Sequence, residues 1–257
     1  MQATIRYLAI VSDDPERLAR FYADSFGMQE LGRSGAGDVS VTDGFFNLSL
    51  LAYRPELGAR GPRQIGIAVD DRTALADRLQ RFAPHLTLQP DEGGLHHGEY
   101  CIADPNGYPV AVSTRGFGVP GSASRLPGMR HVAMCEPRGD AVAEFYANVF
   151  GLEKAFPEMW RSTGRFLTDG TINLAILGDA EETRAAGKEV TIDHAQLGLN
   201  HYGFETPRVG DLIGRLPRGT RREQRLDRRD AQDYYRIWDP DGNHFDLRVA
   251  GAWTAAA

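Results

Sequence analysis

The feature that most constrains this chain is an internal repeat: five short blocks recur in the same order, with a spacing of 124 residues for the first pair and up to 137 for the later ones. The pairs are Ile5-Arg6-Tyr7 and Met129-Arg130-His131, Phe21-Tyr22-Ala23 and Phe145-Tyr146-Ala147, Thr42-Asp43-Gly44 and Thr168-Asp169-Gly170, Gln64-Ile65-Gly66 and His201-Tyr202-Gly203, Asp104-Pro105-Asn106-Gly107 and Asp239-Pro240-Asp241-Gly242. Matches in one order indicate a tandem duplication. A stretch rich in glycine, serine and proline at 116–127 predicts a linker between 1–115 and 128–257.

Each half contains two units with the same local pattern, in which a short apolar strand is followed by a helix. In the first unit Asp14 can cap the helix, Pro15 suits its first position and Gly27 ends it. Extended segments follow, interrupted by Asp-Gly or Asp-Pro-x-Gly turns. The sequence therefore predicts an α+β fold in which β-α-β-β-β occurs four times.

The opening strand of each unit has two different faces, because side chains alternate along a strand. In the third unit Val132 and Met134 lie on one face, and His131 and Ala133 lie on the other. The bulky apolar face suits packing against a helix. The face with a polar residue followed by Ala or Gly leaves room for a lined cavity. The alternative is that the small residues only permit close packing across the sheet.

Paired β-α-β-β-β units that end in a strand after Asp-Pro-x-Gly resemble the vicinal oxygen chelate superfamily. That superfamily includes glyoxalase I, bleomycin-resistance proteins and type I extradiol dioxygenases. The resemblance runs from about Ile5 to Val249 and implies two tandem glyoxalase-like domains, 1–115 and 128–257. It implies less about the reaction, because this fold carries many chemistries. In such proteins a divalent metal lies in the concavity of a curved sheet, held from the first strands of the units and from the last strand.

The resemblance places His131, His201 and Asp246 at the metal-ligand positions of the C-terminal half. Two neutral imidazoles and a carboxylate suit Fe(II), Mn(II), Zn(II) or Ni(II), with Fe(II) favoured by the likeness to extradiol dioxygenases. Asp246 is one methylene shorter than the glutamate usual in the family. The alternative is that the three residues form a metal-free hydrogen-bonded cluster. The N-terminal half has different residues at these positions, so we expect no metal there; they are Tyr7, Gln64 and Ala111.

Three further polar residues are candidates for catalysis in the same cavity. His244 shares a face with Asp246 and could shuttle a proton, add a ligand or lie at the rim. Arg236 replaces a tyrosine usual in extradiol dioxygenases and suits an anionic substrate such as a carboxylate. His194 could act as a general base, or be an exposed loop histidine.

The composition of the chain argues against several classes of binding partner. A formal net charge of −6 argues against binding nucleic acid or an anionic membrane. No apolar run reaches the ~18 residues of a membrane span, and the first residues do not resemble a signal peptide. Two cysteines make no disulfide framework, so a cytoplasmic location is expected. The arginine-rich segment 215–229 suits a solvated loop, or alternatively a lid that attracts an anionic substrate.

These features predict a metal-dependent enzyme for a small oxygenated substrate, most like a ring-cleaving extradiol-type dioxygenase. One alternative is a lyase or isomerase of the glyoxalase type, in which His194 or His244 moves the proton. Another is a metal-free protein that binds or sequesters a small molecule. A homo-oligomer stays open, although the duplication could satisfy sheet pairing within one chain.

Overall fold

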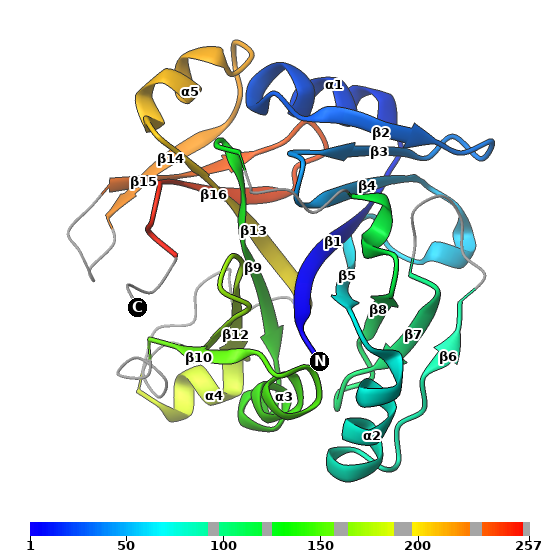
Figure 1. Ribbon diagram of the computed structural model, residues 1–257. Helices are drawn as coiled ribbons and strands as arrows, with labels where there is room; N and C mark the ends of the chain where they lie inside the picture. The colour runs from blue at the N-terminus through cyan, green and yellow to red at the C-terminus, as the bar shows by residue number, and fades with distance from the viewer. Residues whose placement is uncertain (92–97, 120–124, 157–163, 188–196, 227–232, 254–257) are drawn as a thin grey trace.

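The computed structural model describes residues 1–91, 98–119, 125–156, 164–187, 197–226 and 233–253. They form two eight-stranded sheets, one in each half of the chain (Figure 1). The strand order is β2-β3-β4-β1-β5-β8-β7-β6 in the first sheet and β10-β11-β12-β9-β13-β16-β15-β14 in the second. The two orders correspond strand for strand, which confirms the predicted α+β fold of four β-α-β-β-β modules.

The first sheet is built from two modules in succession. Its strands are β1 (Ala3–Ser12), β2 (Gln29–Arg33), β3 (Val39–Thr42), β4 (Asn47–Ala52), β5 (Gly61–Val69), β6 (Gln89–Pro90), β7 (Tyr100–Ala103) and β8 (Pro109–Ser113). Its helices are α1 (Pro15–Phe26), η1 (Pro55–Leu57), α2 (Arg72–Phe82) and η2 (Gly116–Gly118). The opening strand of each module lies at the centre of the sheet, where β1 pairs antiparallel with β5.

The second sheet repeats this arrangement. Its strands are β9 (Gly128–Glu136), β10 (Glu153–Ala155), β11 (Arg165–Thr168), β12 (Asn173–Gly178), β13 (Gly198–Thr206), β14 (Arg222–Leu226), β15 (Asp233–Trp238) and β16 (His244–Val249). Its helices are α3 (Gly139–Phe145), η3 (Tyr146–Phe150), α4 (Ala180–Ala185) and α5 (Val209–Arg215). The helix of the third module is α-helical only in its first part, and η3 continues it as a π-helix.

Local sequence signals set the ends of the first two helices. The Asp14 carboxylate accepts a hydrogen bond from the Arg17 backbone N–H at 3.0 Å, and Gly27 ends α1 with a left-handed φ of 69°. In α2 the Asp71 carboxylate accepts from the Ala74 N–H at 3.0 Å. Among the described residues, no helix is long and apolar enough to cross a membrane.

The two halves share one hydrophobic core. Helix α1 packs onto the second sheet, where the Phe26 and Phe204 ring centroids lie 4.2 Å apart. Figure 1 shows α1 beside α5 at one end of the molecule and α2 beside α3 at the other. The Tyr22 hydroxyl lies 2.5 Å from that of Tyr202, and both donate to Asp239. The predicted boundary at 116–127 falls between the two sheets and stays a prediction.

Each half also supplies a carboxylate to the first strand of the other. The Asp43 side chain accepts from the Met129 backbone N–H at 2.8 Å, and Asp169 accepts from the Ile5 N–H at 2.6 Å. These aspartates belong to the repeated Thr-Asp-Gly turns. The duplication therefore produces a pair of equivalent contacts that join the halves.

Candidate functional site

The candidate site is a row of residues that crosses the second sheet on the face opposite the shared core, which we call the concave face. Backbone register places His131 of β9 and Asp246 of β16 on either side of Gly203 of β13. The row continues to Asn173 of β12 beside His131 and to Arg236 of β15 beside Asp246. We call these five residues the C-terminal row. Residues separated by more than 100 positions in the sequence meet there because the two opening strands are neighbours in the sheet.

The two candidate histidine ligands lie close together and are buried. The His131 and His201 ring centroids are 5.2 Å apart, with exposed fractions of 4% and 7%. The Nδ1 of His131 lies 2.9 Å from Asn173 Oδ1, and the Nδ1 of His201 lies 2.9 Å from Asn200 Oδ1. An amide oxygen only accepts, so each Nδ1 carries the hydrogen, and in the neutral ring Nε2 has the lone pair that a metal ligand needs.

Asp246 is close to these histidines, but its carboxylate is held by Arg236. The Arg236 Nε donates to Asp246 Oδ1 at 2.7 Å and Nη2 donates to Oδ2 at 3.1 Å, a bidentate pair between buried side chains. The same Oδ2 lies 3.6 Å from His201 Nε2. No three His, Cys, Asp or Glu side chains in the described part of the chain are spaced to hold a metal ion. The three predicted metal ligands therefore lie close together, but the Asp246 carboxylate is bound by the Arg236 guanidinium.

The other predicted catalytic residues have different outcomes. The His244 ring lies 5.6 Å from that of His201, as its position two residues before Asp246 predicts. Its neighbour on the other side is Trp238, whose ring is 6.2 Å away. His194 lies outside the described residues.

An apolar wall adjoins the histidine end of the C-terminal row. It consists of small residues and one aromatic ring on β9 to β12, namely Ala133, Ala155, Ala175 and Phe166. These residues lie on the concave face, opposite the bulky side chains that fill the shared core. The concave face therefore combines a polar, charged end with an apolar end.

Sequence reasoning missed two buried residues beside the site, Trp253 and Glu205. The Trp253 ring lies flat against His131, with centroids 4.7 Å apart and an interplanar angle of 4°. The Glu205 carboxylate accepts hydrogen bonds from the backbone N–H groups of Gly251 and Trp253, each at 2.8 Å. An available signal was the aromatic residue shortly after the last strand in both halves, since Phe117 follows β8 as Trp253 follows β16.

The N-terminal half contains an equivalent row without a histidine or a carboxylate. Its members are Asn47, Tyr7, Gly66, Ala111 and Cys101. Tyr7 is fully buried and stacks on Phe117 with centroids 4.8 Å apart, and burial raises the pKa of its hydroxyl. Gln64 lies beside the row, with its amide nitrogen 3.6 Å from the Cys101 sulfur.

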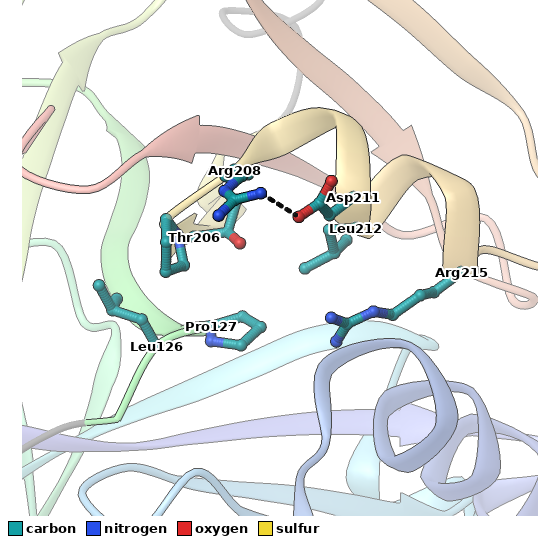
Figure 2. Close-up of a pocket in the computed structure, with 8 residues that line it drawn as sticks. Leu126, Pro127, Thr206, Arg208, Asp211, Leu212 and Arg215 are labelled. Carbon is teal, nitrogen blue, oxygen red and sulfur yellow. Dashed lines mark ion pairs between the residues drawn. The ribbon is translucent and has the colours of Figure 1, made fainter.

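A separate surface pocket of about 340 Å³ lies between the start of β9 and helix α5 (Figure 2). Leu126, Pro127 and Leu212 form its apolar part, and Arg215 extends over its edge. On the same rim Arg208 Nη1 lies 3.8 Å from Asp211 Oδ2. No residue of the C-terminal row lines this pocket, so it is distinct from the candidate site.

The fold and the row define a class: duplicated β-α-β-β-β proteins with a candidate ligand set on one concave face. Residues 4–112 match the family described as the Glyoxalase/Bleomycin resistance protein/Dioxygenase superfamily. This match covers the N-terminal half of the chain, and the C-terminal half repeats the same strand order. No curated protein sequence matches the chain.

Solved structures with the same fold cover almost the whole chain at low identity. They include the 2,3-dioxygenase LapB from Pseudomonas sp. KL28, with 16% identity, a TM-score of 0.69, and 95% of this chain and 91% of that chain covered. A Mn(II)-bound glyoxalase from Novosphingobium aromaticivorans has 17% identity, a TM-score of 0.69, and coverage of 95% and 81%. A catechol 2,3-dioxygenase has 16% identity, a TM-score of 0.69, and coverage of 100% and 91%.

Proposed function

We propose that this protein is a metal-dependent enzyme of the vicinal oxygen chelate type, with His131, His201 and Asp246 as the ligands of one divalent metal. The observation that carries the proposal is the pair of neighbouring buried imidazoles, each fixed through Nδ1 by an asparagine, with the buried Asp246 carboxylate beside His201. Hydrogen bonding of a ligand histidine through its second nitrogen is the usual way to fix its tautomer and ring orientation.

The donor set fits a divalent metal in kind. Two neutral imidazoles and one carboxylate suit Fe(II), which we favour, and also Mn(II), Zn(II) or Ni(II). In the present arrangement the Asp246 carboxylate neutralises the buried guanidinium of Arg236. Metal binding would therefore replace one cationic partner of Asp246 by another, and Arg236 would turn to a different anion.

We propose a ring-cleaving, extradiol-type reaction on a small oxygenated substrate that carries an anionic group. The metal would supply a Lewis-acidic centre that organises substrate oxygens and dioxygen. Arg236 would bind the substrate's carboxylate or phenolate oxygen through its planar fork of N–H donors. His244 would hold or move a proton at a ring nitrogen, since it lies beside His201. The apolar wall at Ala133 and Phe166 would exclude water from the substrate's hydrocarbon part.

The proposal of a dioxygenase reaction rests on similarity to solved structures, and the same site could support a different reaction. Several solved structures of the same fold are described as dioxygenases, and one as a Mn(II)-bound glyoxalase. A glyoxalase-type lyase or isomerase would use the same three ligands, with His244 moving the proton.

A metal-free small-molecule binding protein is the second candidate function. The bidentate Arg236–Asp246 ion pair favours it, because a carboxylate already neutralised by a buried guanidinium needs no metal. In that case the polar end of the concave face would recognise an anion and the apolar wall would take up the rest of the ligand.

Elemental mass spectrometry on untagged, chelator-free protein tests the proposal, with His131→Ala and His201→Ala as matched variants. We expect close to one metal per chain in the wild type and its loss in both variants, whose folding circular dichroism would check. Oxygen uptake by Fe(II)-loaded protein with a panel of catechols then separates dioxygenase from lyase or isomerase. Failure to retain any of the four metals after anaerobic loading would reject the metal site and leave the binding protein.

A further inference from the structure

The chain turns back onto the concave face of the second sheet immediately after β16. Ala250 N–H donates to the Thr206 carbonyl at 3.0 Å, and Ala252 N–H donates to the Val249 carbonyl at 3.3 Å. The two carboxylate oxygens of Glu205 accept separately, Oε2 from Gly251 and Oε1 from Trp253. A side chain with 3% exposure on β13 thus fixes the backbone of the tail. We call residues 250–253 the C-terminal turn.

The C-terminal turn delivers the Trp253 indole to the centre of the C-terminal row. The indole lies parallel to the His131 ring, and Trp253 is only 4% exposed. It lies over Gly203, where an added Cβ would overlap the indole. Arg248 is stacked farther out, its guanidinium carbon 5.6 Å from the indole centroid. The indole therefore needs glycine at position 203 and covers one face of the His131 imidazole.

The N-terminal half contains the same device with different chemistry. Phe117 of η2 lies over Gly66, where an added Cβ would overlap its ring, and stacks on Tyr7, the residue equivalent to His131. Asn47 holds this segment by donating to the Phe117 carbonyl at 2.9 Å. The presence of a folded-back aromatic residue in both halves makes it a feature of the duplicated scaffold. Only in the C-terminal half does the aromatic residue contact a candidate metal ligand.

We propose that Trp253 is a positioning residue for His131 and that Glu205 acts through it by fixing the C-terminal turn. The inference rests on the proposed metal site. Asn173 fixes the Nδ1 edge of the imidazole, and the indole fixes the plane of the ring, so Nε2 has one direction in which to bind. Trp253 also forms the wall beside His131, and its loss would enlarge the space for substrate next to that ligand.

Metal affinity measured by titration calorimetry with Ni(II) or Zn(II) tests the positioning role. We expect Trp253→Ala to weaken binding about tenfold, as loss of a group that orients a ligand does. Trp253→Phe keeps a ring on His131 and should stay within about threefold of the wild type. Glu205→Gln, which retains only one acceptor oxygen, should fall between them. Phe117→Ala is the matched control, since it removes the equivalent ring from the N-terminal half and should leave affinity unchanged.

Fluorescence supplies a readout that a general loss of stability would not produce. The chain has three tryptophans, and Trp160→Phe with Trp238→Phe leaves only Trp253 as emitter. Addition of Ni(II) should quench that emission at one equivalent, and His131→Ala should abolish the quenching.

The outcomes separate the two proposals. Metal retained by His131 and His201, with no quenching of Trp253 and wild-type affinity in Trp253→Ala, would overturn the positioning role and leave the metal site standing. Absence of metal from every protein tested would reject both. An equal loss of affinity in Phe117→Ala and Trp253→Ala would assign the effect to stability and overturn the inference.

Discussion

The two halves of the molecule place equivalent rows on equivalent strands, yet the rows differ at three of their five positions. The N-terminal row is Asn47, Tyr7, Gly66, Ala111 and Cys101, and the C-terminal row is Asn173, His131, Gly203, Asp246 and Arg236. The asparagine and the glycine are common to both. The shared glycine makes room for the covering aromatic ring in both halves. The shared asparagine binds the Phe117 carbonyl in one half and the His131 ring in the other, so its partner changes with the variable positions.

The comparison also separates stability from function. The N-terminal row is closed by a buried Tyr7–Phe117 stack, which suits a structural role. The C-terminal row buries a guanidinium, a carboxylate and, beside them, two imidazoles. Burying charge is costly compared with packing apolar groups, even when the charges are paired. A half that keeps such a cluster is therefore the half to examine for activity.

The largest expected effect comes from giving Asp246 the residue of its N-terminal counterpart. Asp246→Ala removes a proposed ligand and leaves the buried guanidinium of Arg236 without this carboxylate, which should cost about 3–5 kcal/mol of unfolding free energy. Adding Arg236→Met removes the charge and should recover most of that loss. Urea denaturation of both proteins without metal gives the two values. A cost below about 1 kcal/mol for Asp246→Ala would show that the pair is not a tightly coupled buried pair.

A similar loss of stability without any functional effect is expected from the N-terminal stack. Phe117→Ala opens a cavity over Tyr7 and Gly66 and should cost about 3–4 kcal/mol, as large-to-small core substitutions do. Activity per folded molecule should stay at the wild-type level, because the row beneath Phe117 has no histidine or carboxylate. Denaturation and activity assays on the same preparation test this, and reduced activity in fully folded protein would contradict the division between the halves.

Much of the fold was predictable because strand alternation and the repeat are local signals. Val132 and Met134 were predicted to face the helix and Ala133 the opposite side, and the structure places them in separate clusters. The change from α3 to the π-helical η3 was not predicted, and nothing in the local pattern explains it.

The site was predictable in its members more than in its contacts. The family resemblance placed His131 and His201 at ligand positions, and alternation along the opening strands predicted the face on which they lie. That Arg236 would bind Asp246 depends on the register between β15 and β16, which single-sequence patterns do not specify. Trp253 was missed because its direction depends on hydrogen bonds to Glu205, a residue almost 50 positions away in the sequence.

A smaller, pH-dependent effect should distinguish the contacts that join the halves. At the end of β1, Ser12 donates to Asp241 in one Asp-Pro-x-Gly turn, and at the end of β9, Glu136 accepts from Asn106 in the other. Burial, opposed by the Asn106 hydrogen bond, raises the pKa of Glu136 to about 7.

Because the folded state favours neutral Glu136, its contribution to stability is present below the ordinary pKa and is lost as the pH rises toward 7. Glu136→Gln should therefore match the wild type near pH 4.5 and exceed it by about 2 kcal/mol at pH 8. Urea denaturation across this range measures the difference. A constant difference between the two proteins at all pH values would contradict the raised pKa.

The smallest expected effect concerns competition between Arg236 and the metal for Asp246. The N-terminal row has Cys101 at the equivalent position, so the guanidinium is peculiar to the C-terminal half. Arg236→Gln keeps a hydrogen-bond donor and removes the positive charge, which should raise metal affinity about tenfold, or about 1.4 kcal/mol. The rise in melting temperature on adding Zn(II) should accordingly be larger in the variant than in the wild type. If metal affinity falls instead, Arg236 orients the Asp246 carboxylate for metal binding. The arginine of the C-terminal row would then assist the metal and would not compete with it for Asp246.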